Sequence, residues 1–106
     1  MKPFLLLLLL ASRPPMGWNS WDSYSMTITE AEFKANAKVL AERLKPFGWE
    51  YAVVDGGWYL QNPARADKSE AFRFTLDGNG RYVPPANRFP SAADGNGFKP
   101  LADYAH

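Results

Sequence analysis

Four hydrophobic residues follow one another from Tyr51 to Val54, and two of them are β-branched valines. A short apolar run bounded by chain-breaking residues predicts a strand buried on both faces. The run ends at Asp55, followed by two glycines and then Trp58 and Tyr59. A carboxylate at the end of such a strand lies where α/β proteins bind ligands. The alternative is that this acid only caps the next element.

A second hydrophobic pattern, with a helical period, covers Thr27–Lys45. Its apolar positions lie on one face of the predicted helix: Phe33, Ala37, Leu40 and Leu44. Thr29 and Glu32 have the spacing of a capping box, which predicts the start of the helix. Pro46 and Gly48 then predict its end. The stripe is typical of core packing, and we assign it no chemistry.

A shorter apolar segment, Met16–Trp21, precedes this helix and predicts another strand. Trp18 and Trp21 are three positions apart, so on a strand they would face opposite sides. We expect Trp18 in the core and Trp21 toward a pocket. With Tyr51–Asp55 as the next strand, the order strand, helix, strand predicts a right-handed parallel βαβ unit.

The pattern changes after the second strand. Gln61–Glu70 is polar and predicts a loop, whereas Phe72–Leu76 and Arg81–Val83 flank an Asp-Gly-Asn-Gly turn and predict a hairpin. Apolar residues at helical spacing predict a second helix over residues 97–106. Two strands and two helices cannot cover the faces and edges of a parallel sheet. We therefore expect an incomplete α/β fragment of a longer protein.

Composition narrows the range of ligands. The formal net charge of +1 gives no field that would attract nucleic acid or an anionic membrane. The chain has no cysteine, and its single histidine is His106, so we expect neither a metal site nor a cofactor. Aromatic residues make up 15% of the sequence, with four tryptophans, which fits a carbohydrate ligand but also a core of large side chains.

The N-terminal residues 1–12 have the features of a signal peptide. Lys2 is followed by the apolar run Phe4–Leu10 and by the small residues Ala11 and Ser12. The run is too short to span a bilayer. We therefore predict export to the periplasm or the extracellular space, with residues 13–106 as the mature part. The alternative is a chance leucine tract or a misassigned start.

Three blocks of the sequence resemble the N-terminal part of the glycoside hydrolase family that contains the α-galactosidases (melibiases): PPMGWNSWDSY, YAVVDGGWY and GRYVPPANRFPSAADGNGFKPLADYAH. They occur in the order that the family has and cover most of the chain after Ser12. The resemblance implies a (β/α)8 barrel followed by an antiparallel β domain. It places this chain at the first two βα units of the TIM barrel.

The resemblance also implies roles for individual residues. Trp21 matches a tryptophan that lines the sugar pocket, and Asp55 matches an acid that binds sugar hydroxyls through charge-assisted hydrogen bonds. Trp58 either adds an aromatic surface beside the acid or belongs to the core. Many family members have Asp-Asp-Cys-Trp where this chain has Asp55, Gly56, Gly57 and Trp58. Because the second acid is missing, one sugar contact is lost or is supplied by another part of the protein, which weakens the case for galactose.

The family uses two aspartates on later strands, one as nucleophile and one as general acid/base, in a retaining mechanism. No acid of this chain matches either of them. We predict an α-galactosidase-like enzyme acting on terminal α-galactosides as the full-length protein, and no activity for the 106-residue chain alone. The alternatives are a β-L-arabinopyranosidase, an α-N-acetylgalactosaminidase, or a non-catalytic sugar-binding or structural βα protein.

Overall fold

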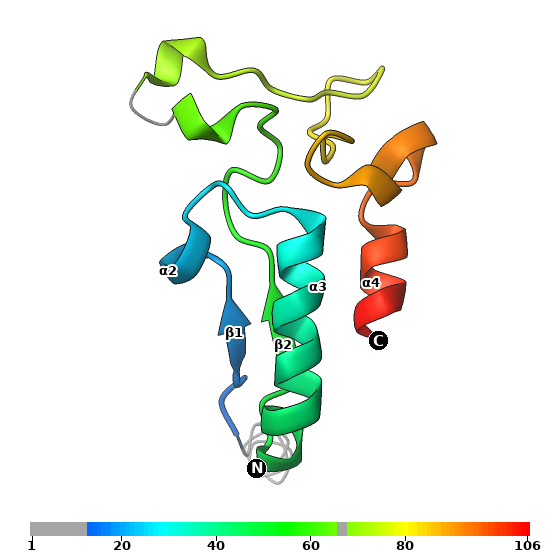
Figure 1. Ribbon diagram of the computed structural model, residues 1–106. Coiled ribbons are helices and arrows are strands. Elements are labelled where there is room, and N and C mark those ends of the chain that lie inside the picture. The colour runs from blue at the N-terminus through cyan, green and yellow to red at the C-terminus, as the bar shows by residue number, and fades with distance from the viewer. Residues whose placement is uncertain (1–12, 66–67) are drawn as a thin grey trace, which may run out of the picture.

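Two short strands stand side by side at the centre of the molecule (Figure 1). The computed structural model describes residues 13–65 and 68–106, so the predicted signal peptide lies outside the described residues. Strand β1 (Gly17–Asn19) pairs in parallel with β2 (Tyr51–Val53), and the first residues of the two strands are opposite each other. The predicted parallel pairing is therefore confirmed.

Both strands are shorter than predicted, and the prediction that Met16–Trp21 is one strand is wrong at its C-terminal end. After β1 the chain turns into the short helix α2 (Trp21–Tyr24). The side-chain oxygen of Asn19 accepts the N–H of Trp21 at 2.8 Å, which is an Asx turn. This local hydrogen bond competes with strand pairing, so Trp21 belongs to a helix and not to the sheet.

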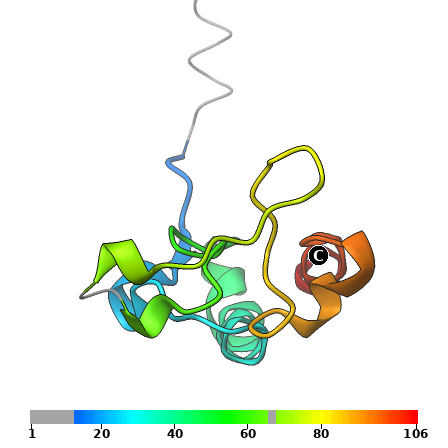
Figure 2. The same ribbon diagram turned by 90° about the horizontal axis from the view of Figure 1, so that it is seen from above.

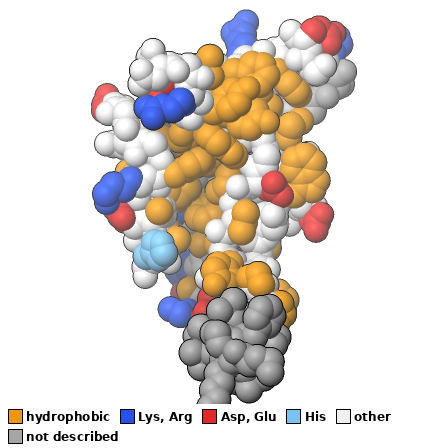
Figure 3. All heavy atoms as spheres, turned by 180° about the vertical axis from the view of Figure 1, so that it is seen from behind, with side chains coloured by type: hydrophobic (Ala, Val, Ile, Leu, Met, Phe, Trp, Pro, Cys, Tyr) orange, Lys and Arg blue, Asp and Glu red, His pale blue; other side chains and the backbone are white. Residues whose placement is uncertain are grey.

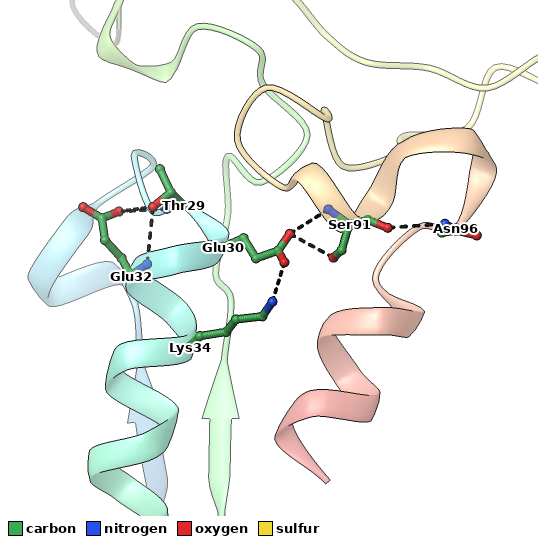
Figure 4. Close-up of polar contacts among 6 residues, drawn as sticks. All are labelled: Thr29, Glu30, Glu32, Lys34, Ser91 and Asn96. Carbon is green, nitrogen blue, oxygen red and sulfur yellow. Dashed lines mark hydrogen bonds and ion pairs between the residues drawn. The ribbon is translucent and has the colours of Figure 1, made fainter.

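Helix α3 (Glu30–Val39) begins at the predicted capping box (Figure 4). The hydroxyl of Thr29 accepts the N–H of Glu32 at 3.4 Å, and the carboxylate of Glu32 accepts the N–H of Thr29 at 2.8 Å. The helix continues through a π-helical turn, Leu40–Leu44, and one 3-10 turn. Gly48, with φ of +92°, ends it in the left-handed conformation that glycine adopts without strain.

The core lies where α3 covers the two strands. Six buried side chains form it: Ile28, Phe33, Ala37, Phe89, Ala92 and Leu101. Trp18 packs against this cluster, with its ring centroid 6.2 Å from that of Tyr24 and 6.4 Å from that of Phe33. The expected core position of Trp18 is therefore confirmed.

One face of the sheet is left bare by the described residues. Ala52 and Val54 pack against the core, whereas Tyr51 is 56% exposed and Val53 is 42% exposed. Alternate residues of a strand face opposite sides, so these two lie on the face away from α3. Seen from behind, hydrophobic side chains gather across the middle of the molecule (Figure 3). The prediction of a strand buried on both faces is wrong for this structure, because helices cover one face only.

The C-terminal part completes a small mixed α/β unit. Helix α4 (Lys99–Ala105) lies beside α3, close to the predicted position (Figure 1). Residues 60–65 and 68–83 pass over the end of the molecule at which both strands finish (Figure 2). In this segment the predicted hairpin is reduced to the single antiparallel bridge of Leu76 with Tyr82.

Candidate functional site

Ser20 joins the C-terminal ends of β1 and β2. Its side chain is fully buried, its N–H donates to the carbonyl of Val53 at 3.1 Å, and its hydroxyl accepts the N–H of Asp55 at 3.0 Å. These two hydrogen bonds extend the contact between the strands beyond their last paired residues. They fix the point at which Asp55 leaves β2, so this candidate residue stands at the strand end, as predicted.

The carboxylate of Asp55 is partly buried and organises the turn that follows it. Its Oδ1 accepts the N–H of Gly56 at 2.7 Å. Its Oδ2 makes no hydrogen bond to any residue in the described ranges 13–65 and 68–106. A carboxylate oxygen with its lone pairs open is an acceptor for ligand hydroxyls.

Trp21 lies beside the same turn, although it comes from α2 instead of β1. The indole is 46% exposed, and a methyl group placed at Gly56 would lie 3.7 Å from its Cζ3 atom. The structure therefore brings Trp21 and the turn of Asp55 together at one edge of the molecule. An acceptor beside an exposed aromatic face suits a ligand that carries both hydroxyl groups and C–H surface.

Trp58, the third candidate, is held at the edge of the core. Its ring makes edge-to-face contacts with Tyr59 and Phe98, each with centroids 5.3 Å apart. It is partly buried and packs against the core cluster. These contacts fit a packing role, and the part of the ring that stays exposed also fits the predicted aromatic surface beside the acid.

The two glycines after Asp55 differ in what the backbone requires. Gly57 has φ of +82°, and a Cβ atom there would lie 2.5 Å from Cβ of Met26. Both the conformation and the close approach exclude a side chain. At Gly56 a Cβ atom would meet only the Trp21 ring, at an ordinary contact distance. The absence of a side chain at Gly56 is therefore not imposed by the fold.

Arg88 is a buried residue to which the sequence analysis assigned no role. It is 6% exposed, and burial lowers the pKa of its guanidinium below the ordinary value. Its Nη1 donates to the carbonyls of Gly57 and Leu60 at 2.7 and 2.8 Å. Its Nη2 donates to those of Met26 and Ile28 at 2.6 and 2.7 Å. The one available signal was its place before Phe89 and Pro90 in the Pro-x-x-Arg-Phe-Pro segment.

Glu30 is a second buried charge that the pattern of the chain did not reveal (Figure 4). Its carboxylate accepts from Lys34 Nζ at 2.6 Å and from the N–H and hydroxyl of Ser91 at 2.9 and 2.8 Å. Burial raises the pKa of Glu30, but these hydrogen bonds outweigh it and hold the pKa below its ordinary value. The contacts tie the start of α3 to the segment that carries Arg88.

The described residues show neither a metal site nor a membrane span. Within ranges 13–65 and 68–106 no group of three His, Cys, Asp or Glu side chains could hold a metal ion, and no helix is long and apolar enough to cross a membrane. A hollow of about 390 Å³ lies between α3, β2 and α4, lined largely by apolar side chains such as Leu40 and Leu101. It contains none of the three predicted site residues.

Curated relatives of the chain are α-galactosidases. An α-galactosidase of Cyamopsis tetragonoloba is 34% identical over 92% of this chain and 20% of the relative. The α-galactosidase A of Cellvibrio japonicus is 32% identical over 92% of this chain and 20% of its own length. The chain spans between 12% and 21% of the length of the first curated relatives that it matches. No protein-family model matches the sequence.

Solved structures give the same result. A GH27 β-L-arabinopyranosidase from Geobacillus stearothermophilus is 49% identical to this chain and superposes on it with a TM-score of 0.79. The match covers 92% of this chain and 22% of the arabinopyranosidase chain. An α-galactosidase of Mortierella vinacea is 28% identical over 92% of this chain and 20% of its own, with a TM-score of 0.65. On this agreement of sequence and structure, the chain belongs to the glycoside hydrolase family of the α-galactosidases.

Proposed function

We propose that this chain forms part of the sugar-binding site of a retaining glycoside hydrolase that acts on terminal α-galactosides. The observation that carries this proposal is the meeting of Asp55 and Trp21 at the ends of two parallel strands. Asp55 accepts hydrogen bonds from sugar hydroxyls, and the indole of Trp21 covers one face of the ring. Trp58 extends the aromatic wall. Family membership supports the reaction class.

The chain is, in this proposal, the first two βα units of a (β/α)8 barrel. Support comes from the parallel pairing of β1 and β2 and from α3 on one face of them. The exposed apolar side chains of Tyr51 and Val53 fit the same architecture, because a barrel fills its interior with such residues. Residues 13–106 then belong to the catalytic barrel, and residues 1–12 are a signal peptide that directs export.

A β-L-arabinopyranosidase is the second candidate, and two observations favour it. The relative with this activity is 49% identical, a higher value than for the curated α-galactosidases that this chain matches. In addition, Gly56 stands where many family members have a second acid. β-L-Arabinopyranose has the ring configuration of α-D-galactopyranose without the hydroxymethyl group. A sugar with one hydroxyl fewer needs one acceptor fewer, so a glycine at this position suits it.

The proposal assigns no residue of this chain to the catalytic pair, because no acid of the chain matches the family's nucleophile or its acid/base. Retaining hydrolysis needs both groups on opposite sides of the glycosidic bond. In this proposal the 106 residues alone are therefore inactive. They supply contacts that bind the sugar, but no group that takes part in the chemical step. An α-N-acetylgalactosaminidase, or a non-catalytic sugar-binding or structural protein, would be distinguished by the substrates that the complete protein binds and cleaves.

The test is an assay of the protein expressed from its complete reading frame on p-nitrophenyl α-D-galactoside and p-nitrophenyl β-L-arabinopyranoside. Asp55→Ala should remove a charge-assisted contact and lower kcat/KM about ten- to a hundredfold at an unchanged Tm. Asp22→Ala, at an exposed position of α2, is the control and should change neither kcat/KM nor Tm. Gly56→Asp should shift the ratio of the two activities toward the galactoside. Turnover of neither substrate would refute the proposal, as would a fully active Asp55→Ala.

A further inference from the structure

The guanidinium of Arg88 contacts carbonyl oxygens where a buried charge usually has a carboxylate partner. All four recorded hydrogen bonds run to main-chain oxygens, and within the described residues no carboxylate forms an ion pair with it. Its Nε is buried without a hydrogen-bond partner among the same residues. Burying a charge is costly, and here four hydrogen bonds to carbonyls that would otherwise lack donors offset that cost. The role of the arginine therefore depends on which parts of the chain these carbonyls belong to.

The four carbonyls belong to two different loops. Met26 and Ile28 lie in the connection that follows α2, the helix that begins with Trp21. Gly57 and Leu60 lie in the loop that follows Asp55. One guanidinium thus bonds to the two loops that follow the candidate sugar-binding residues Trp21 and Asp55.

The two loops also touch directly. Gly57 approaches Met26 so closely that no side chain fits at the glycine. Such an approach brings backbone carbonyls together, and a donor between them must satisfy several acceptors at once. The planar guanidinium does this with a fixed separation between its two terminal nitrogens. A lysine ammonium is a point charge with three donors and cannot span both pairs of carbonyls in the same geometry.

We propose that Arg88 is a positioning residue for sugar binding, which fixes the separation between Trp21 and Asp55 by bonding the two loops that follow them. This role rests on the proposed function of the site. It does not involve the reacting atoms, so its loss should weaken the binding of substrate and leave the chemical step intact. In kinetic terms, KM should rise while kcat stays nearly constant.

The experiment uses the protein expressed from its complete reading frame, with the variants Arg88→Lys and Arg88→Gln. In both, KM for the preferred p-nitrophenyl glycoside should rise about tenfold or more, with kcat within about twofold of wild type. Amide hydrogen exchange in peptides covering residues 24–29 and 54–62 should become faster in both loops together. Kinetic constants are expressed per folded molecule, measured by circular dichroism at the assay temperature.

Ser91→Ala is the matched control. Ser91 lies on the same segment as Arg88 and bonds to Glu30, but among the described residues it makes no hydrogen bond to either loop. This variant should lose stability without a rise in KM and without faster exchange in the two loops. An equal rise in KM in the control would show that general destabilisation explains the effect, and the positioning role would be refuted.

Two further results separate the outcomes. Normal wild-type kinetics with an unchanged KM in Arg88→Lys would refute the role of Arg88 and leave the proposed function standing. A wild-type protein that binds neither sugar would refute the proposed function, and the role of Arg88 with it.

If both variants fail to fold, amide hydrogen exchange in the wild type still decides. The two loops should then open with one shared rate, and clearly different rates would refute the role.

Discussion

Arg88 and Arg81 lie near each other in the sequence but in opposite environments. Arg88 is 6% exposed and bonds to four carbonyls from distant parts of the chain. The side chain of Arg81 is 74% exposed and pairs with the carboxylate of Asp77, four residues earlier, at 2.9 Å. Of these two arginines, only Arg81 takes part in a salt bridge within the described residues.

The comparison shows that an ion pair is a poor guide to the importance of an arginine. The turn that contains Arg81 is held by local hydrogen bonds, and Asp77 accepts the N–H groups of Asn79 and Arg81 at 2.8 and 3.0 Å. Water can replace the exposed guanidinium there. At Arg88 water has no access, so loss of the side chain leaves buried carbonyls without donors.

Arg88→Met should give the largest loss of stability. It removes the donors for four buried or partly buried carbonyls while keeping an apolar chain of similar length. We expect the free energy of unfolding to fall by about 3–5 kcal/mol, measured by urea denaturation. Arg81→Met is the matched control and should change the free energy of unfolding little. Equal effects of the two substitutions would contradict the comparison.

Gly57→Ala should follow, because the added methyl group meets Met26 and the residue must keep a positive φ. Strain and overpacking together should cost about 2–4 kcal/mol in the free energy of unfolding. Gly56→Ala, one residue earlier, meets only the edge of Trp21 and should cost about 0.5 kcal/mol or less. Similar midpoints for the two variants would show that the close approach of the loops is not maintained in solution.

Glu30→Gln should give an intermediate and pH-dependent loss of about 1–2 kcal/mol at neutral pH, because charge-assisted hydrogen bonds to Lys34 and Ser91 are weakened. The pKa of Glu30 is lowered in the folded state, so its contribution is complete above the ordinary value of 4.5. It is lost as the pH falls through the lower folded pKa. The difference between variant and wild type should therefore shrink in acid, as measured by urea denaturation at several pH values. A constant difference would argue against these contacts.

Arg81→Gln should give the smallest effect, with no measurable shift in Tm. The pKa of Asp77 is lowered chiefly by the backbone N–H groups of Arg81 and Asn79, and these donors remain in the variant. An NMR titration should therefore still find the pKa of Asp77 below its ordinary value. A return of that pKa to its ordinary value would show that the side chain of Arg81, and not the backbone of the turn, controls the carboxylate.

Local patterns were sufficient for much of the fold. The capping box of Thr29 and Glu32 and the apolar stripe of the helix depend on residues a few positions apart, and the structure confirms the capping box. It confirms burial of the stripe at Phe33, Ala37 and Leu40, whereas Leu44, in the π-helical turn, is 40% exposed and does not belong to the core. The parallel pairing of β1 and β2 followed from the order of the elements and the length of the crossover. The pattern failed at Trp21, because the hydrogen bond from its N–H to Asn19 ended the strand early and placed the indole on a helix.

The sequence by itself determined where the helix begins, which strands pair, and which acid stands at a strand end, because short-range hydrogen bonds and periodic burial encode these features. Only the tertiary structure decided how the strand-end loops are held together. The hydrogen bonds of Arg88 join residues 28 to 62 positions apart, and the bonds of Glu30 to Ser91 span 61 positions. No local pattern marks such partners, since they meet only after the loops have packed and excluded water from the charges between them.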